Sequence, residues 1–350
     1  MMKRIRVLIA DDSSLARSLL RGILEDEADI EVVGEAGNGR EAVDLARELK
    51  PDLITMDIEM PVMNGLDAIE EIMCSKAIPI LVVSSVADAV NALDAVGRGA
   101  LEVVGKPDYS PEEAASFVAR VRLLAGVMVI TRMRPRKSVL AAPPLTPSPA
   151  AFPRLSDSGE YARVFAIACS TGGPQALAQI LPALPEDFPC PVVIAQHISD
   201  GFAGGMAEWM ARLCKLPVRL AADGDRLQAG VIHISPSEQH CSVVPTRRIA
   251  FVNRSERDIY HPSCDVLLAS VAEVFGPQAV GIILTGMGRD GARGISRIRA
   301  MGGLTLGQDE GSSVVYGMNR VAIETGDVQQ VLPLSAIADE MVRLAVGNAK

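Results

Sequence analysis

The chain has 350 residues, a length that favours about two domains, and 49% of them are hydrophobic, which is ample for two buried cores. Its 34 Lys and Arg residues against 43 Asp and Glu residues give a net charge of −9, which argues against nucleic acid as the main partner. Apolar runs stay well short of the roughly 18 residues that a membrane span needs, and the strand pattern that starts at Ile5 leaves no room for a signal peptide, so we expect a cytoplasmic protein without membrane insertion.

The first third of the chain alternates strands and helices. Apolar runs predict strands over residues 5–10, 31–36, 53–56, 80–83 and 101–104. Amphipathic stretches between and after them predict a helix that ends near residue 25 and helices over 39–49, 66–73, 88–98 and 111–124. This alternation indicates a five-stranded, doubly wound parallel sheet, in which ligands bind outside the carboxyl ends of the strands.

Polar residues stand at those strand ends, namely Asp11, Asp12, Asp57, Ser84 and Lys106. Three carboxylates at one sheet edge repel each other unless a cation joins them, and oxygen ligands suit Mg²⁺. A carboxylate such as Asp57, held between that metal and the Lys106 ammonium, could accept a phosphoryl group. The alternative is that these are ordinary polar loop residues.

The motifs Asp11-Asp12, Asp57-x-x-Met60-Pro61-x-x-Asn64-Gly65, Ser84 and Lys106-Pro107 resemble the response-regulator receiver domain, over residues 3–124. The resemblance implies that Asp57 is the phosphoacceptor and that a histidine kinase is the phosphodonor. It also implies that Asp11, Asp12 and Asp57 hold Mg²⁺, and that Ser84 and Lys106 contact the phosphoryl oxygens. One position departs from the pattern, because Val103 stands where many receivers carry an aromatic residue.

Residues 125–160 read as a proline-rich linker between two domains. A basic cluster at residues 132–137 lies near its start. The cluster is either a solvated tether or a docking site for an acidic partner.

The second half again predicts an α/β domain, with a mostly parallel sheet and an antiparallel hairpin inserted near residues 231–252. Strands are expected over 163–168, 192–195, 218–221, 231–234, 242–244, 249–252, 279–284 and 304–308. Helices are expected up to about residue 184, over 207–213 after a glycine-broken stretch at 201–206, over 265–275, up to about residue 301, and over 335–346. The six scattered cysteines contain no C-x-x-C pair and are expected to be reduced packing residues rather than ligands.

Ser170 stands where a buried strand meets a helix, beside Gly172 and Gly173. Free backbone N–H groups at a helix start can hold an anion, so this serine is a candidate nucleophile with an oxyanion pocket in place. A phosphate cradle and a simple helix cap are the alternatives. The surrounding sequence is not the G-x-S-x-G elbow of common hydrolases, because residue 168 is alanine.

A serine nucleophile needs a base, and His197 follows a strand as Ser170 does. Asp290 follows a third apolar strand and could orient that histidine. Asp290 lies in a glycine-rich turn, residues 286–291, which could also bring the Met287 amide to the oxyanion. Of the other histidines, His233 is expected to be packed or at the surface, and His240 to lie in a polar loop.

The second half keeps a series of motifs that together resemble the chemotaxis protein-glutamate methylesterase domain, over residues 161–347. These are Cys169-Ser170-Thr171-Gly172-Gly173-Pro174, Gln196-His197, Gly224-Asp225-x-Leu227, Pro236-x-x-x-His240, Pro262-Ser263-x-Asp265-Val266-Leu267, Leu284-Thr285-Gly286-Met287-Gly288-x-Asp290-Gly291 and Val315-Tyr316-Gly317-Met318. The resemblance implies a hydrolase that demethylates glutamate methyl esters, and deamidates certain glutamines, on the cytoplasmic helices of methyl-accepting chemoreceptors. It further implies that Ser170 is the nucleophile, His197 the base and Asp290 its orienter, with Thr171 and Met287 as pocket residues and no cofactor in this half.

A receiver, a linker and this domain in series imply a hydrolase that phosphorylation activates during chemotactic adaptation. The alternative is a non-catalytic adaptor in which the receiver only controls docking. A DNA-binding regulator is disfavoured by the acidic charge and by the lack of a basic recognition helix.

Overall fold

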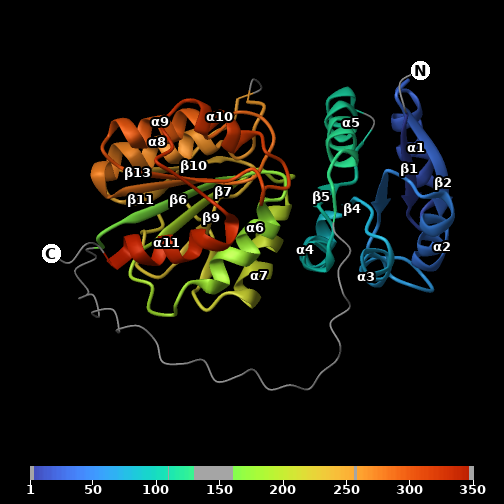
Figure 1. The fold of residues 1–350 in the computed structure, drawn as a ribbon, viewed down its shortest axis with the longest axis horizontal. Coiled ribbons are helices and arrows are strands. Elements are labelled where there is room, and N and C mark those ends of the chain that lie inside the picture. Colours follow the sequence, from blue (N-terminus) through green and yellow to red (C-terminus); the bar gives the residue numbers. More distant parts are fainter. Residues whose placement is uncertain (1–3, 109, 130–160, 256–257, 347–350) are drawn as a thin grey trace. The chain divides into compact units, whose positions relative to one another are not determined.

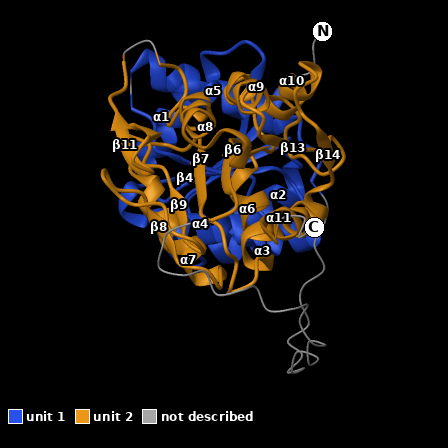
Figure 2. Ribbon diagram, turned by 90° about the vertical axis from the view of Figure 1, so that its left-hand side faces the viewer, with its two compact units in different colours: residues 1–144 blue, residues 145–350 orange. Residues whose placement is uncertain are grey.

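The computed structural model describes residues 4–108, 110–129, 161–255 and 258–346. The chain divides into two compact units, Met1–Pro144 and Leu145–Lys350, which Figure 2 colours separately. Most of the predicted linker, including the basic cluster at 132–137, lies outside the described residues. Within the described ranges, no helix combines the length and the apolar character that crossing a membrane requires.

The first unit is a five-stranded parallel sheet in the order β2-β1-β3-β4-β5, as the strand–helix alternation predicted (Figure 1). Its strands are β1 (Ile5–Ala10), β2 (Ile30–Ala36), β3 (Leu53–Met56), β4 (Ile80–Ser84) and β5 (Glu102–Gly105). Its helices are α1 (Ser14–Glu25), α2 (Gly39–Leu49), α3 (Gly65–Ser75), α4 (Ala89–Arg98) and α5 (Pro111–Ala125), with a short 3₁₀ turn, η1 (Val86–Asp88), before α4.

Local sequence explains where these helices start. Ser13, Asn38, Asn64 and Ser110 each precede a helix and accept a hydrogen bond from an amide of its first turn. The central strands β3 and β4 are mostly apolar, and every residue in them is buried. Capped helices on both faces of an apolar sheet leave the carboxyl edge as the place where polar side chains collect.

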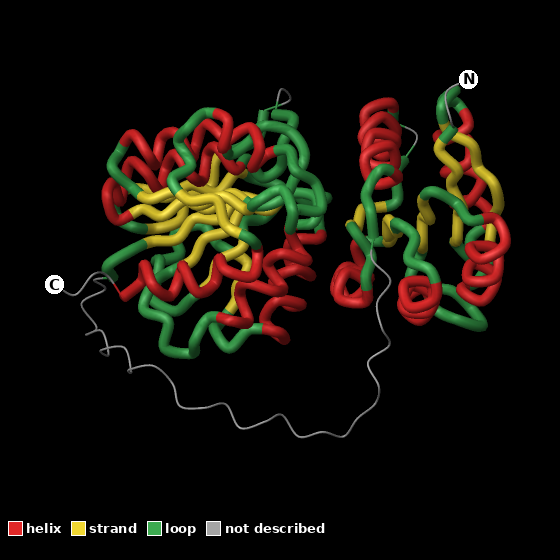
Figure 3. The backbone as a smooth tube through the Cα atoms, viewed as in Figure 1, coloured by secondary structure: helices red, strands yellow, loops and turns green. Residues whose placement is uncertain are grey.

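The second unit contains a seven-stranded sheet in the order β14-β13-β12-β6-β7-β9-β8, and every strand pair in it is parallel. Its strands are β6 (Val164–Cys169), β7 (Val192–Gln196), β8 (Val218–Leu220), β9 (Ile232–Ile234), β12 (Ala279–Ile283), β13 (Leu304–Gln308) and β14 (Gln330–Leu332). Helices α8 (Cys264–Phe275), α9 (Ala292–Ala300) and α10 (Met318–Glu324) cover one face of the sheet, and α6 (Gly173–Ile180), α7 (Phe202–Leu213) and α11 (Leu334–Val346) cover the other (Figures 1 and 3).

The antiparallel hairpin is shorter than predicted. It consists of β10 (His240–Val244) and β11 (Arg248–Val252), while residues 232–234 belong to the parallel sheet as β9. His240 therefore lies in a strand and is buried, which corrects its placement in a polar loop. The short elements α10 and β14 were not predicted.

The glycine-broken stretch at 201–206 is also a correction, because α7 begins at Phe202. Phe202, Ala203 and Met206 are all buried. The gain from burying these side chains outweighs the roughly 1 kcal/mol that each helical glycine costs.

Candidate functional site

Ser170 follows β6 at the carboxyl edge of the seven-stranded sheet and is 9% exposed. Hydrogen bonds to its backbone hold it on two sides. Its N–H donates to Thr285 O at 3.0 Å, and its carbonyl accepts from the side-chain Nε2 of Gln196 at 2.8 Å. Gly172 precedes α6 with φ 78°, and a Cβ there would lie 2.6 Å from the Val314 side chain. Glycine is therefore required at this turn.

His197 and Asp290 form a close pair at the same edge. His197 Nε2 lies 2.8 Å from Asp290 Oδ2, and their side chains are 9% and 4% exposed. The His197 amide donates to Cys169 O at 3.0 Å, so the pairing of β6 with β7 places this histidine beside the serine turn. The ring also stacks on Tyr260, with centroids 5.1 Å apart. The imidazole is thus held on two sides.

Asp290 lies in the loop between β12 and α9, and its carboxylate contacts the N-terminus of α8. Its Oδ2 accepts from the Cys264 amide at 2.6 Å, and its Oδ1 accepts from the Asp265 amide at 2.9 Å and from Ser263 Oγ at 3.1 Å. Burial would raise the pKa of Asp290, but the bonds from His197 and the helix amides outweigh it and lower that pKa. Asp290 is therefore an ionised acceptor, and the proton between the two side chains belongs to His197 Nε2.

The loop after β12 packs directly against the serine. A Cβ on Gly286 would lie 2.6 Å from Ser170 Cβ, so the close approach depends on glycine. The next residue is Met287, which is half exposed. Across the described residues, the hydrogen bonds leave the amides of Thr171 and Met287 and the Ser170 hydroxyl without a partner. Thr171, Met287 and Ser170 therefore each retain a free polar group at this edge.

A second set of side chains supports the site and was not assigned a role from the sequence. Asp265 accepts from the amides of Gly291 and Gly294 at 2.9 and 2.8 Å and pairs with Arg293. His240 Nδ1 accepts from the Ser263 amide at 2.9 Å. Both residues appear in the sequence motifs, and that is the only signal that could have found them. His233 is buried in β9, as expected for a packed residue.

The carboxyl edge of the first unit gathers Asp57, Lys106 and two more acids. Lys106 Nζ lies 2.8 Å from both Asp57 Oδ2 and Asp11 Oδ2, and Asp57 Oδ1 accepts from the Ile58 amide at 2.7 Å. One oxygen from each of Asp11, Asp12 and Asp57 lies within 4.8 Å of the others. Burial raises the pKa of Asp57, although Lys106 opposes it. Three crowded carboxylates with one ammonium fit a small divalent cation such as Mg²⁺.

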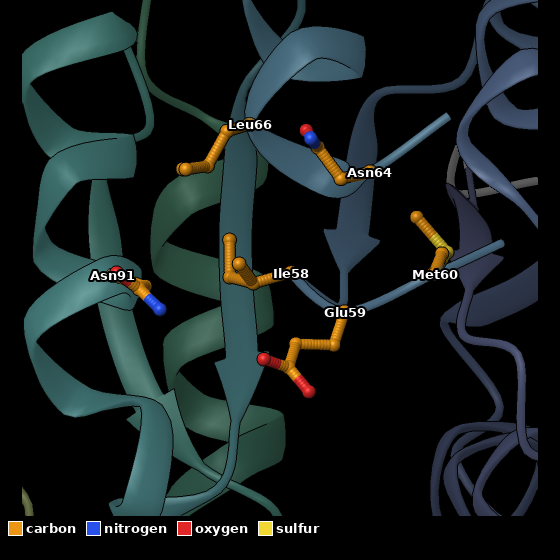
Figure 4. A pocket seen from close by; sticks show the side chains of 6 residues that line it. All are labelled: Ile58, Glu59, Met60, Asn64, Leu66 and Asn91. Atoms are coloured by element: carbon orange, nitrogen blue, oxygen red, sulfur yellow. The ribbon is translucent and has the colours of Figure 1, made fainter. Parts of the chain in front are cut away.

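Ser84 ends β4 and is fully buried, and its hydroxyl has no partner in the described part of the chain. Next to the loop that follows Asp57 lies a cavity of about 410 Å³ between that loop and α4 (Figure 4). It is lined by Ile58, Glu59, Met60, Asn64, Leu66 and Asn91. The lining combines polar and apolar side chains. It includes Ile58, the residue after Asp57, but not Asp57 itself.

Two family models match the chain. The model described as CheB methylesterase matches residues 165–341, and the response regulator receiver domain matches residues 7–116. The first segment contains Ser170, His197 and Asp290, and the second contains Asp57 and Lys106.

Relatives cover nearly the whole chain. It is 56% identical over 345 residues to a protein-glutamate methylesterase/protein-glutamine glutaminase of Paramagnetospirillum magneticum, covering 97% of this chain and 96% of the relative. A protein of Myxococcus xanthus with the same name is 41% identical, with 96% and 92% covered. Among solved structures, the CheB methylesterase catalytic domain of Thermotoga maritima is similar, with 31% identity and a TM-score of 0.51, covering 52% of this chain and 98% of that structure.

Proposed function

Because the chain belongs to the CheB methylesterase family and carries a response regulator receiver domain, we propose that Ser170, His197 and Asp290 act together as the catalytic triad of a phosphorylation-activated hydrolase. The substrates are glutamate methyl esters, and certain glutamines, on the cytoplasmic helices of chemoreceptors. The observation that carries the proposal is the buried pair of His197 Nε2 and Asp290 Oδ2 beside the serine turn.

The first chemical step is attack of Ser170 Oγ on the γ-carbonyl carbon of the methylated glutamate. Since Nε2 carries the proton donated to Asp290, Nδ1 of His197 is the nitrogen that takes the serine proton. The oxyanion of the tetrahedral intermediate lies within reach of the free amides of Thr171 and Met287. Nδ1 then returns the proton to the departing methanol, and an acyl-serine remains.

Water completes the reaction by the same route in reverse. His197 Nδ1 takes a proton from water, the hydroxide attacks the acyl-serine, and the proton passes back to Ser170 Oγ as the glutamate is released. With a glutamine substrate the leaving group is ammonia, and the acyl-enzyme is the same. One triad thus accounts for both activities in the family name.

The receiver supplies the control. We assign Asp57 as the phosphoacceptor, with a chemotaxis histidine kinase as donor, Lys106 and Ser84 as contacts of the phosphoryl oxygens, and Asp11, Asp12 and Asp57 as the Mg²⁺ ligands. The bound cation would neutralise charge on the phosphoryl oxygens. We take residues 3–124 as the receiver, 125–160 as the linker and 161–347 as the catalytic domain. Phosphorylation then shifts the balance between a restrained and an active arrangement of the two.

The test is methanol release from methylated receptor membranes, with and without a small phosphodonor and Mg²⁺. We expect stimulated release that disappears in Asp57→Asn and falls to background in Ser170→Ala. Near-normal release by Ser170→Ala would overturn the triad, and release indifferent to the phosphodonor would overturn the switch. Labelling by a fluorophosphonate that requires Ser170 separates the esterase from a non-catalytic adaptor, which has no activated serine.

A further inference from the structure

A third side chain meets the histidine–aspartate pair. Cys264 Sγ lies 3.4 Å from His197 Nε2, the same nitrogen that lies 2.8 Å from Asp290 Oδ2. One donor atom from each of these residues lies within 4.8 Å of the other two. We propose that His197, Cys264 and Asp290 form a binding site for a thiophilic divalent cation, with Zn²⁺ as its typical ligand, and that the bound ion inhibits the hydrolase.

The donor set and its spacing suit zinc. Zn²⁺ binds thiolate at about 2.3 Å and imidazole nitrogen or carboxylate oxygen at about 2.0–2.2 Å, so donors around a tetrahedral ion lie about 3.3–3.6 Å apart. The sulfur and nitrogen are already at 3.4 Å, and the nitrogen and oxygen must separate by a few tenths of an ångström. Three protein donors leave one coordination position of a tetrahedral ion open.

The fold holds the thiol in place for this role. Cys264 is the first residue of α8, after the cap residue Ser263, and its side chain is fully buried. Of the three donors, the His197 side chain is the most exposed, at 9% against 4% for Asp290. Among these donors, the His197 side chain is therefore the one that solvent reaches most readily.

Inhibition follows from the proton balance at the imidazole. Coordination through Nε2 requires that nitrogen to be unprotonated, so the neutral ring changes tautomer and carries its proton on Nδ1. Zinc binds the thiolate, so the Cys264 thiol releases its proton to solvent when the ion binds. With Nδ1 protonated, His197 cannot accept the Ser170 proton. This consequence rests on the proposed function, whereas the binding itself does not.

The two sites have different donor atoms and therefore favour different metal ions. Among the receiver's described residues, the cluster that could hold an ion offers carboxylate oxygens from Asp11, Asp12 and Asp57, which suit Mg²⁺. The site at His197 offers sulfur and nitrogen, which favour Zn²⁺ and Co²⁺. Excess Mg²⁺ should therefore saturate the receiver and leave the inhibition by zinc unchanged.

The first experiment titrates Zn²⁺ into the full chain with excess Mg²⁺ and follows ester hydrolysis. We expect saturable inhibition that a chelator reverses, and a loss of zinc potency of at least about tenfold in Cys264→Ala, measured against that variant's own metal-free rate. Cys241→Ala removes another fully buried thiol, from β10, and is expected to keep wild-type sensitivity. Equal inhibition of wild type and Cys264→Ala would overturn the proposal.

The second experiment detects binding without turnover. Co²⁺ added to Ser170→Ala is expected to give a thiolate-to-cobalt absorption band that Zn²⁺ displaces and that Cys264→Ala abolishes. A missing band in Ser170→Ala overturns the metal site. A band in a wild-type chain that shows no esterase activity overturns the proposed function and leaves the metal site standing. If Cys264→Ala does not fold, Cys264→Ser, which is closer in volume, carries the same expectations.

Discussion

His197 Nε2 and Asp290 Oδ2 lie 2.8 Å apart, so the histidine meets this carboxylate through Nε2 and not through Nδ1. Asp290 is itself held by the amides of Cys264 and Asp265 at the start of α8. The partial positive charge of that helix end favours the ionised carboxylate. One helix terminus therefore fixes both the charge and the direction of the residue that selects the imidazole tautomer.

Replacing Asp290 with asparagine should remove activity mainly through kcat. The amide of Asp290→Asn can donate to Nε2, which favours the tautomer with its proton on Nδ1 and leaves no base for Ser170. The same kind of tautomer error costs about 10⁴-fold in kcat in a serine protease. Steady-state kinetics of ester hydrolysis would measure it. Asp187→Asn changes an exposed acid elsewhere in the unit and serves as the control; comparable losses in the two variants would contradict the assigned role.

His240 is expected to act on the reaction through Ser263. Its Nδ1 accepts from the Ser263 amide, and its Nε2 lies 3.0 Å from Asp258 Oδ2, so the neutral ring carries its proton on Nε2. Ser263 Oγ in turn donates to Asp290. His240 is therefore a positioning residue, two hydrogen bonds away from the proposed orienting acid.

A pair of matched substitutions separates this role from simple packing. An asparagine oxygen can replace Nδ1 as the acceptor for Ser263, whereas glutamine best replaces Nε2. We expect His240→Asn to keep most of kcat, and His240→Gln to lose about tenfold or more, with KM little changed in both. Equal losses in the two variants, or a change confined to KM, would refute the positioning role. Thermal unfolding checks that both variants stay folded.

Sequence patterns located the proposed chemical groups because each follows a buried strand. Asp57 follows a strand of the five-stranded sheet, whereas Ser170, His197 and Asp290 follow strands of the seven-stranded sheet. In each sheet, parallel topology alone brings such residues to the carboxyl edge. The hydrogen bonds that support these groups could not be predicted from the sequence. Ser263 and His240 are 23 residues apart in the chain, and Asp265 and Gly294 are 29 apart, so neither bond follows from a local period. The start of α7 was misplaced because burial of Phe202 overrides the glycines that follow it.

Two glycine substitutions should affect different properties: one should lower the reaction rate, and the other should raise the stability of the fold. In Gly286→Ala the new Cβ would meet Ser170 Cβ at 2.6 Å, which forces the serine or its loop to move. A shift of this size near reacting atoms can cost about 100-fold in rate. Gly204→Ala adds a methyl group where no atom lies within 4 Å, in the first turn of α7, and should stabilise the chain by up to about 1 kcal/mol without changing kcat. Denaturant unfolding and ester hydrolysis measure the two effects, and unchanged activity in Gly286→Ala would contradict the close packing.

Asp57 should destabilise the receiver in the absence of a divalent cation. Burial raises its pKa above the ordinary value of 3.8, with Lys106 opposing, so folding penalises the ionised form. That penalty is present at neutral pH and disappears as pH falls below 3.8. We expect Asp57→Asn to raise the receiver's unfolding temperature at pH 7 without Mg²⁺, and the difference from wild type to shrink on acidification. Mg²⁺ should stabilise wild type more than Asp57→Asn. Asp44→Asn, at an exposed site on α2, controls for net charge, and a lower unfolding temperature for Asp57→Asn at pH 7 would contradict the argument.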